Sequence, residues 1–517
     1  MYSTLDRRGT WHGVYGRSCS VVLSAEEVSR SRVAIEQLES RRLLSAGELD
    51  PSFGTGGKVV TDFGGTDSGQ AVAVQSDGRI VVVGHRGEAD FVLARYNANG
   101  TLDTTFGSVG RVTTDFGGQD AAFAVAVQAD GRIVTAGRSG GAFALARYNV
   151  DGSLDAAFGS GGKVVTDLGT TDPTSTIFDI AVQPDGKIVA AGTRGFDDFA
   201  LARYNPDGTL DSSFGTGGVV VTDFGPGFDG AGALELQIDG RIVVAGQAGV
   251  DDGHKDFALA RYLPDGTLDT AFGGTGLVTT DFSGAFDGAS GLVVQPDGKI
   301  VAAGISGFSD VALARYNSDG SLDPTFGSGG RVVTELGDFD VAFELVRQSD
   351  GKLVTAGERG GDFAVIRYNA DGTLDGTFGA GGVTITDFGT PNDIAFGAAI
   401  EPDGGIVAAG QTSGDFAVAR YLAATLTPAQ EVQGVANELA AIVSQGAALT
   451  QSQANGLLAK LDAAKNQLNQ NRDDTAVRLL EAFENQVQGY ISGGKLTQQN
   501  GDALISATDA IIAQLLG

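Results

Sequence analysis

The stretch Phe91–Gly107 (FVLARYNANGTLDTTFG) contains the pattern that decides the fold. An apolar, strand-like segment ends in Ala-Arg-Tyr, a glycine-containing turn follows, and the motif Leu-Asp-x-x-Phe-Gly comes directly after it. This unit recurs seven times between Gly47 and Leu422, with intervals of 52 to 58 residues between the phenylalanines of the motif. These are Phe53, Phe106, Phe158, Phe214, Phe272, Phe326 and Phe378. Such a period predicts a repeat architecture in which each unit packs on its neighbours.

The first full unit contains four short segments with strand character, separated by turn sequences. They are Lys58–Phe63, Ala71–Gln75, Arg79–Gly84 and Phe91–Tyr96. The Ser-Asp-Gly sequence after the second segment is typical of a tight hairpin, because Asp and Gly tolerate the positive φ that such turns need. Four strands per unit predict propeller blades rather than a sandwich. We therefore expect residues 47–422 to form an all-β, seven-bladed β-propeller of four-stranded blades.

Side-chain size indicates which strand of each blade lies at the central channel. Blades converge at the axis, so the innermost strand needs small residues, and the segment Ala71–Gln75 and its repeats supply them. Examples are Ala71, Ala73, Ala124 and Ala126. Lys58–Phe63 carries Lys, Thr and Asp, which suit an exposed edge strand. If Ala71–Gln75 is the innermost strand of its blade, Lys58–Phe63 completes the last blade and closes the ring. A ring with Lys58–Phe63 innermost is an alternative.

Residues 423–517 change to a helical pattern. Glycine becomes rarer, and apolar residues recur at three- and four-residue spacing. Thr450 and Gln453 form a capping box. We expect four helices, at roughly 428–445, 450–468, 472–491 and 497–516, which form a small all-α bundle.

Composition restricts the partners of the chain. It has 64 Asp and Glu against 35 Lys and Arg, and this net charge of -29 disfavours nucleic acid as a partner. Cys19 is the only cysteine, which excludes an intramolecular disulfide and a zinc site built from thiolates. No run of about 18 apolar residues is present, so we expect no membrane span. We also expect a monomer without a cofactor.

Residues 1–46 are rich in Arg and Ser and differ from the repeats. Their longest apolar run, Val21–Leu23, is too short for a standard secretory signal peptide. We interpret residues 1–46 as a flexible basic leader and a possible export segment.

The repeats resemble a known family. Val182–Gly192 (VQPDGKIVAAG) and Ala202–Gly215 (ARYNPDGTLDSSFG) match the motifs of the delta-60 repeat, a bacterial propeller-type repeat. Its plan is similar to that of NHL-type repeats, which place the equivalent of Ala71–Gln75 innermost. The resemblance covers all seven units and implies a propeller without a defined biochemical activity.

The two ends of the chain carry further resemblances. Leu457–Ala464, with Leu480–Phe483 and Ala510–Ile512, resembles the FIMAH domain, a helical module appended to bacterial extracellular proteins. Leu38–Ala46 (LESRRLLSA) looks like a short motif near the start of many predicted exported bacterial proteins. Both resemblances imply an extracellular or cell-surface protein.

One arginine and one aspartate recur in every unit. Because a ligand contacts only some blades, a charge repeated in all of them favours a structural ion pair, for which the planar guanidinium is well suited. The predicted partners are the arginines of the Ala-Arg-Tyr segments and the aspartates of the Leu-Asp motifs. The arginines are Arg95, Arg147, Arg203, Arg261, Arg315, Arg367 and Arg420. The aspartates are Asp50, Asp103, Asp155, Asp211, Asp269, Asp323 and Asp375.

The turn Asn205–Asp211 (NPDGTLD) and its repeats carry oxygen side chains at alternate positions, as calcium loops do. The terminal glutamate of an EF-hand loop is absent, and Asx-turn hydrogen bonds explain the same residues without a metal. We favour the turn and keep calcium as the alternative.

Loop lengths divide the units into a constant and a variable end. The connections before the Ala71–Gln75 and the Phe91–Tyr96 repeats vary in length, as in Gly169–Phe178 and Val250–Asp256. Strands within a blade alternate in direction, so both variable loops should share one face, where binding residues are favoured. The candidate binding residues are Arg86, Asp90, Arg194, Asp197, Asp198, Asp251, Asp252, His254, Lys255, Asp256, Arg359 and Asp362. Unconstrained drift of loop length is the competing interpretation.

Two classes of function compete. The first is a non-enzymatic extracellular or cell-surface scaffold whose propeller face binds a protein, peptide or glycan. The alternative is a polysaccharide-active hydrolase or lyase that uses neighbouring carboxylates, such as Asp197 with Asp198 or Asp251 with Asp252.

The histidines of the repeats do not indicate catalysis. His85 and His254 are interpreted as loop residues, because the sequence places no nucleophile and orienting acid beside either of them. We therefore expect no catalytic residues, no metal and no enzymatic activity.

Overall fold

The computed structural model describes residues 45–516 except 88, 171–173, 196–197, 252–253, 283–285, 308, 338, 424–427, 445–448 and 471. These residues form two compact units, a β-propeller over described residues 45–423 and a helical unit over described residues 428–516. Residues 1–44 of the predicted leader lie outside the described part. Its last two residues belong to the propeller, where Ala46 is buried and its carbonyl accepts a hydrogen bond from Gly379 N at 2.8 Å.

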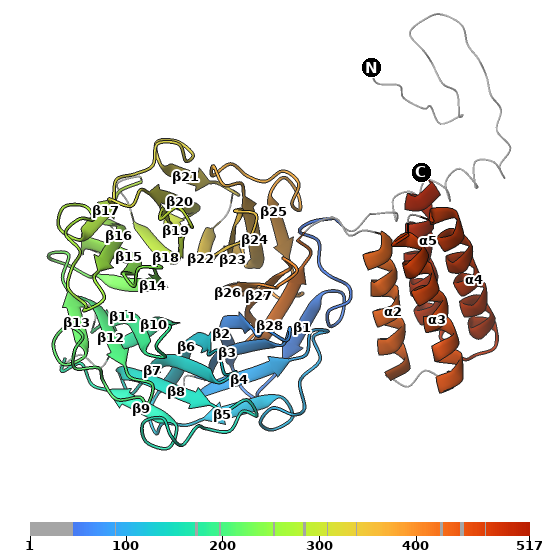
Figure 1. Ribbon diagram of the computed structural model, residues 1–517, viewed down its shortest axis with the longest axis horizontal. Coiled ribbons are helices and arrows are strands. Elements are labelled where there is room, and N and C mark those ends of the chain that lie inside the picture. Colours follow the sequence, from blue (N-terminus) through green and yellow to red (C-terminus); the bar gives the residue numbers. More distant parts are fainter. Residues whose placement is uncertain are drawn as a thin grey trace, which may run out of the picture. The chain divides into compact units, whose positions relative to one another are not determined.

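Seven sheets of four antiparallel strands form the propeller (Figure 1), which confirms the predicted fold class. From the innermost strand outward, blade 1 contains β2 (Asp67–Val74), β3 (Ile80–Arg86), β4 (Asp90–Tyr96) and β5 (Arg111–Thr114). Blade 2 contains β6 (Asp120–Val127), β7 (Ile133–Ser139), β8 (Ala142–Tyr148) and β9 (Lys163–Thr166). Blade 3 contains β10 (Thr176–Val182), β11 (Ile188–Arg194), β12 (Asp198–Tyr204) and β13 (Val219–Thr222). Blade 4 contains β14 (Gly230–Leu236), β15 (Ile242–Asp251), β16 (His254–Tyr262) and β17 (Leu277–Thr280).

The remaining three blades follow the same plan. Blade 5 contains β18 (Asp287–Val294), β19 (Ile300–Ser306), β20 (Asp310–Tyr316) and β21 (Arg331–Thr334). Blade 6 contains β22 (Asp340–Arg347), β23 (Leu353–Arg359), β24 (Asp362–Tyr368) and β25 (Val383–Thr386). Blade 7 contains β26 (Asp393–Ile400), β27 (Ile406–Thr412), β28 (Asp415–Tyr421) and, as its outermost strand, β1 (Lys58–Thr61).

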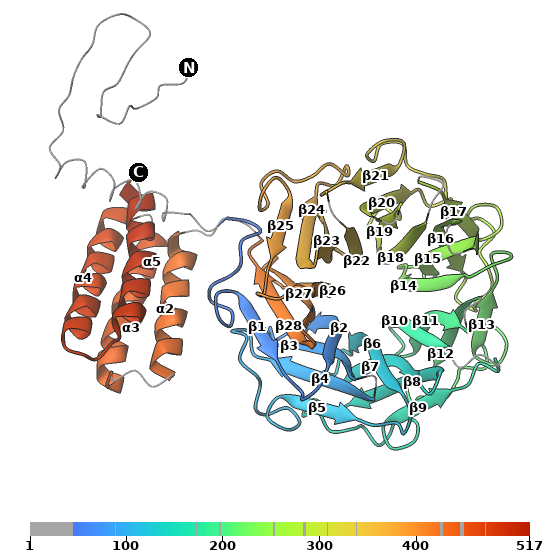
Figure 2. The same cartoon turned by 180° about the vertical axis from the view of Figure 1, so that it is seen from behind.

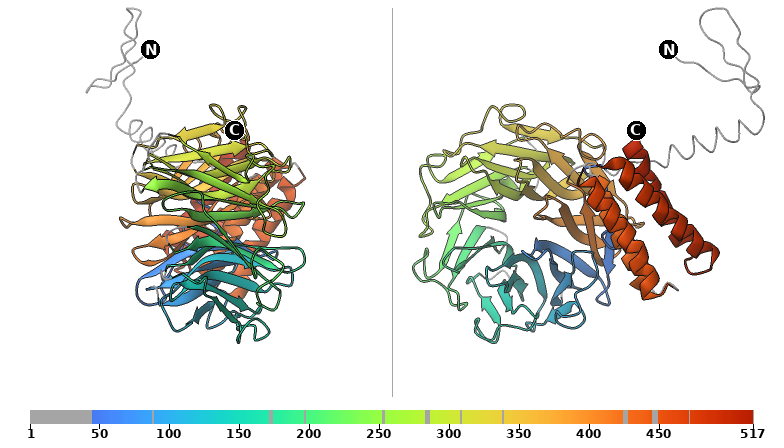
Figure 3. Two further views of the ribbon diagram at one scale, coloured as in Figure 1. Left: turned by 90° about the vertical axis from the view of Figure 1, so that its left-hand side faces the viewer. Right: turned by 45° about the vertical axis from the view of Figure 1, so that its right-hand side comes forward.

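The predicted order of the strands within a blade and the predicted closure of the ring are confirmed. The strands that contain the small-residue segment surround the axis, and β2 contacts its counterparts β6 and β26 in the two neighbouring blades. The opposite face of the ring shows the same order (Figure 2), and the blades are seen edge-on in Figure 3. Strand β1 pairs with β28, Val59 opposite Val418, so the two ends of the propeller share one blade. The alternative with Lys58–Phe63 innermost is wrong.

Each innermost strand contains a β-bulge that the sequence pattern did not reveal. In β2 the register with β3 shifts between Gly69 and Ala71, so Gln70 is the extra residue. Gly84 makes this possible, because a Cβ at that position would lie 1.8 Å from the carbonyl oxygen of Ser68. The bulge interrupts the two-residue alternation, and for that reason the predicted strand began at Ala71 whereas β2 begins at Asp67.

Apolar side chains fill the space between neighbouring blades. One cluster joins Phe143 and Leu145 of blade 2 to Ile188 of blade 3, all fully buried. A hydroxyl pair accompanies each interface: Tyr204 donates to Thr166 Oγ1 at 3.0 Å, from blade 3 to the outermost strand of blade 2. Burial raises the pKa of this tyrosine, so its hydroxyl stays protonated and able to donate.

The helical unit contains α2 (Pro428–Ser444), α3 (Gln451–Leu468), α4 (Asp473–Ser492) and α5 (Gln498–Leu516), within a residue or two of the predicted bounds. The capping box of Thr450 and Gln453 at the start of α3 is present. Consecutive helices contact one another and α2 also contacts α5, around a core that includes Leu457 and Phe483. None of the described helices is long and apolar enough to cross a membrane.

Candidate functional site

The seven repeated arginines lie in structural ion pairs. Arg95 Nε donates to Asp103 Oδ2 at 2.9 Å, its Nη1 donates to the carbonyl of Val150 in the next blade at 2.6 Å, and its guanidinium covers Phe106. The same contacts recur around the ring. The pairs are Arg95–Asp103, Arg147–Asp155, Arg203–Asp211, Arg261–Asp269, Arg315–Asp323, Arg367–Asp375 and Arg420–Asp50. Each arginine therefore joins its strand to the segment before the outermost strand of its own blade and to the next blade.

A second basic residue reaches the same aspartate in most blades. Lys187 Nζ lies 3.1 Å from Asp211 Oδ2, opposite the contact with Arg203. Hydrogen bonds from Ser213 and the charges of both basic residues hold the pKa of Asp211 well below its usual range. These aspartates are thus ionised and fully engaged in structure.

The Asn-x-Asp-Gly turns are Asx turns. Asp207 Oδ1 accepts hydrogen bonds from both the amide and the hydroxyl of Thr209, at 3.0 and 2.7 Å. Asn205 Nδ2 donates to Thr209 Oγ1 at 3.0 Å. These bonds account for the oxygen side chains of the predicted calcium loop without a metal.

The two kinds of variable loop do lie on one face of the propeller, here called the loop face. Asp67 at the start of β2 is opposite Arg86 at the end of β3, and Arg86 is opposite Asp90 at the start of β4. Several predicted binding residues are held in ion pairs there. Arg86 binds Asp90 at 2.6 Å, and Arg194 Nη1 lies 3.5 Å from Asp198.

Blade 4 carries the longest hairpin of the loop face. Asp251 ends β15 opposite His254, which begins β16 and is exposed. Lys255 is buried, with its Nζ 4.1 Å from the ring centre of Phe228. Asp252 and Asp197 lie outside the described residues. The prediction that His85 and His254 are loop residues is wrong, since each belongs to a strand, β3 and β16 respectively.

Three groups of carboxylates on the loop face could hold a divalent cation. Each combines an aspartate near the start of the third strand from the axis, the aspartate after the outermost strand and the first residue of the innermost strand of the next blade. The groups are Asp415–Asp62–Asp67, Asp256–Asp281–Asp287 and Asp362–Asp387–Asp393, each with one oxygen per residue within 4.8 Å of the others. Burial, followed by the charge of Asp281, raises the pKa of Asp256. Burial and the charge of Asp387 raise the pKa of Asp362 in the same way. Arg359 is opposite Asp362 in the β23–β24 hairpin.

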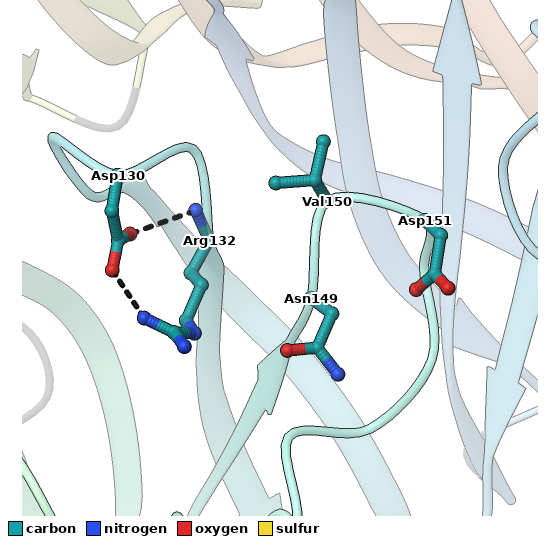
Figure 4. Close-up of a pocket in the computed structure, with 5 residues that line it drawn as sticks. All are labelled: Asp130, Arg132, Asn149, Val150 and Asp151. Carbon is teal, nitrogen blue, oxygen red and sulfur yellow. Dashed lines mark hydrogen bonds and ion pairs between the residues drawn. The ribbon is translucent and has the colours of Figure 1, made fainter.

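One pocket lies at the constant face, between two turns of blade 2 (Figure 4). It has a volume of about 490 Å³ and is lined by Asp130, Arg132, Asn149, Val150 and Asp151. Asp130 accepts hydrogen bonds from the amide and the guanidinium of Arg132, drawn as dashed lines in the figure. Equivalent Asp-Gly-Arg turns occur in other blades, as at Asp77 and Arg79. This pocket is therefore a consequence of the repeat.

The central channel contains a cavity of about 340 Å³ that differs from blade to blade. The extra residue of each bulge lines it. In order from blade 1 to blade 7 these residues are Gln70, Phe123, Phe178, Gly232, Ser290, Phe343 and Phe396. The residue at this position thus varies from blade to blade, in a ring of side chains that line one cavity.

Four of these residues form what we call the aromatic collar: Phe123, Phe178, Phe343 and Phe396. They stand in two tilted pairs, with ring centres 5.5 Å apart for Phe123 and Phe178 and 5.1 Å apart for Phe343 and Phe396. Phe178 keeps 38% of its surface exposed. Blades 4 and 5 supply only Gly232 and Ser290, so the collar is open on that side. Partly exposed aromatic surface around a cavity is typical of a ligand site.

Three carboxylates of the innermost strands affect one another's pKa, and we call them the channel acids: Asp179, Glu235 and Glu344. Asp179 and Glu344 directly follow Phe178 and Phe343 in the chain and line the same cavity. Burial raises the pKa of Asp179 to about 7, and burial with the charge of Asp179 raises that of Glu344 to about 8. Burial also raises the pKa of Glu235. Backbone amides are the only groups in the described part of the chain that lower these values.

Neither the collar nor the channel acids were among the residues predicted from the sequence. An available signal was an acid in an otherwise small-residue strand, as at Asp179 and Glu344, where other blades have Ala or Gly. Aligning the seven innermost strands would have found it.

Two family descriptions match parts of the chain. The first, "Domain of unknown function (DUF5122) beta-propeller", matches residues 75–106, 128–158, 183–214, 237–272, 295–326 and 348–378. The second, the FIMAH domain, matches residues 434–513. No match was found among curated proteins.

The solved structures that match this chain are distant. A gluconolactonase from Xanthomonas campestris is 14% identical, with a TM-score of 0.37, over 70% of this chain and 97% of that one. Drosophila plexin A, solved with semaphorin 1b, is 10% identical, with a TM-score of 0.37, over 73% and 88%. A GH43 endo-arabinanase from Bacillus licheniformis is 14% identical, with a TM-score of 0.27, over 47% and 91%. By the two family matches, the chain contains DUF5122 β-propeller repeats, matched in six stretches between residues 75 and 378, and a C-terminal region that matches the FIMAH domain.

Proposed function

We propose that this protein is a non-enzymatic, extracellular or cell-surface binding protein of the delta-60, NHL-like type, whose propeller binds a protein, peptide or glycan. The observation that carries the proposal is the ring of bulge residues. Seven near-identical blades present seven positions to one cavity, and four of them hold partly exposed phenylalanines. A purely structural channel would favour the small residues found elsewhere in these strands.

The localisation rests on the two ends of the chain. The FIMAH domain accompanies bacterial extracellular proteins, and Leu38–Ala46 resembles the start of exported ones. Fractionation of the native cell tests this part, because a protein found only in the cytoplasm would contradict it.

No specific observation favours the hydrolase or lyase alternative. Of its carboxylate pairs, Asp198 is bound to Arg194, while Asp197 and Asp252 lie outside the described residues. Release of sugar by the purified protein from a panel of polysaccharides would revive this alternative.

The binding proposal is tested by screening the whole chain against a glycan array and a random heptapeptide library. Hits are then measured on Phe178→Ser and Phe343→Ser, which place in these blades the residue that blade 5 carries at Ser290. Loss of binding in both variants supports the channel, with Val165→Ser, at an exposed residue of the outermost strand β9, as the control that should keep binding. Hits that survive in both variants but disappear when Val250–Asp256 is exchanged for a shorter loop would assign binding to the loops instead.

A further inference from the structure

The channel acids are the exception among the enclosed charges of the propeller. Each buried arginine of the ring is matched by an aspartate at hydrogen-bond distance, as in the pair of Arg203 and Asp211 at 2.8 Å. The channel acids instead raise one another's pKa, and among the described residues neither Asp179 nor Glu344 forms an ion pair. In the described part of the chain, Asp179 accepts hydrogen bonds from two backbone amides, Leu234 N and Ile180 N, both at 2.7 Å. A carboxylate enclosed without a positive partner is costly.

Glu344 is directed into the cavity that it lines. Its Oε1 accepts a hydrogen bond from Leu345 N at 2.9 Å, and no described residue donates to its Oε2. Glu344 follows Phe343 in β22, as Asp179 follows Phe178 in β10, and all four residues line the cavity. The cavity thus has an aromatic entrance on the side of the loop face and a negative interior.

We propose that this cavity binds a positively charged group on an apolar stem, namely a lysine or arginine side chain of a peptide or protein ligand. The inference rests on the proposed function and names the chemistry of its ligand. The apolar stem would pack against the aromatic collar, where the faces of the phenylalanine rings also attract a cation. The charged end would reach Asp179 and Glu344 and supply the positive partner that both lack. A neutral glycan would leave these carboxylates without that partner.

The size of the cavity and its surroundings agree with such a ligand. A volume of about 340 Å³ holds one long side chain rather than a folded segment. The basic groups nearest to the collar lie around Phe123: the guanidinium of Arg138 is 5.8 Å from its ring centre, and the ring of His85 is 6.2 Å away. Arg347 lines a separate pocket with Glu235, further towards the constant face. None of these groups is among those that lower the pKa of Asp179 or Glu344.

The test uses benzamidine, a cation on an aromatic ring, and benzamide, its neutral isostere, in titrations followed by ligand-observed NMR. With the whole chain at about pH 9, where both carboxyls are ionised, benzamidine should bind about tenfold more tightly than benzamide. At about pH 5 the two probes should bind equally weakly, since the carboxyls are then neutral while the amidinium keeps its charge. Glu344→Gln and Asp179→Asn should each remove the preference for benzamidine. Glu481→Gln, an exposed residue of α4, is the matched control and should keep it.

Each contrary result has a separate meaning. If both probes bind equally at about pH 9 and Phe343→Ser removes this binding, the preference for a cation is overturned. The proposed function, binding in the channel, would then still stand. No binding of benzamidine, or binding unchanged in both Glu344→Gln and Asp179→Asn, would overturn the inference. The comparison of the two probes at the two pH values needs only the natural chain. It therefore tests the inference even if a variant fails to fold.

Discussion

Arg420 Nη2 lies 2.7 Å from Asp50 Oδ2, although 370 residues separate the two in the chain. The pair repeats, across the junction of the ring, the contact that every other blade makes between neighbouring segments. Arg420 also donates to the carbonyl of Ala98 in blade 1, and β28 pairs with β1. The two ends of the propeller are therefore joined by the same interactions that join its blades.

The first prediction compares the contributions to stability of a buried and an exposed arginine that bind the same aspartate. Asp269 binds the buried Arg261 at 2.8 Å and the half-exposed Arg241 at 2.9 Å. Arg261→Ala leaves the buried charge of Asp269 without its buried positive partner. It should therefore lower the free energy of unfolding by about 3–5 kcal/mol. Arg241→Ala should cost about 0–1 kcal/mol, because solvent screens an exposed pair. Urea unfolding measures both, and equal costs would contradict the structural role of the buried arginines.

The second prediction concerns the hydroxyl pairs between blades. Tyr204→Phe removes the hydrogen bond to Thr166 and leaves that threonine buried without this donor. The free energy of unfolding should fall by about 1 kcal/mol. Tyr490→Phe in the helical unit is a control for the same chemical change on a partly exposed residue. A propeller whose stability is unaffected by Tyr204→Phe would show that this bond contributes nothing to blade packing.

The third prediction is a pH dependence of stability. The folded-state pKa values of Asp179 and Glu344, about 7 and about 8, lie above the ordinary values of 3.8 and 4.5. The folded chain therefore binds more protons than the unfolded chain between these values. The stability that these two groups contribute is complete below about pH 4 and is lost as the pH rises to about 8.

The comparison of Glu344→Gln with the natural chain isolates this contribution. The variant should be more stable than the natural chain at about pH 9 and nearly equal to it at about pH 4, where the glutamate is neutral in both states. Thermal unfolding at the two pH values measures the difference. A variant that is less stable at about pH 9 would mean that Glu344 has a positive partner that the structure does not reveal.

The fourth prediction concerns the carboxylate groups of the loop face. Burial and the charge of Asp62 raise the pKa of Asp415, which shows that the carboxylates repel one another. In a buffer with a chelator, Asp415→Asn should raise the melting temperature. The equivalent change in blade 1, Asp90→Asn, should lower it slightly, because Asp90 is bound to Arg86 at 2.6 Å. If added calcium stabilises the natural chain but not Asp415→Asn, the group holds a cation.

Much of the fold could be predicted from the sequence, because a strand or turn that is uncertain in one copy of the repeat is clear in others. The strand and the Leu-Asp-x-x-Phe-Gly motif of Phe91–Gly107 each occur seven times, so strand number, hairpin turns and blade count are each supported by several copies. The ion pairs could be predicted for the same reason, since the arginine and the aspartate are eight residues apart in six of the seven pairs, as in Arg203 and Asp211. The phase followed from side-chain size, because only small residues fit where the blades converge.

The candidate site could not be predicted in this way, because it is formed where the copies differ. Phe178 and Phe343 are 165 residues apart and reach one cavity only after the ring has closed. The bulge that directs them inward is visible only as a glycine on the neighbouring strand, such as Gly84. Loop length drew attention to Arg86 and Lys255, which the structure places in contacts within the protein.

The central claim, that the ligand enters the channel through the aromatic collar, is tested most directly by filling the opening of the collar. Ser290→Phe places in blade 5 the residue that blades 2, 3, 6 and 7 already carry at this position, so the fold should be retained. Ligands selected from the peptide library and the glycan array are then titrated against the natural chain and the variant by calorimetry. The account predicts that Ser290→Phe abolishes binding at an unchanged melting temperature. Binding of the same ligands with undiminished affinity would contradict it.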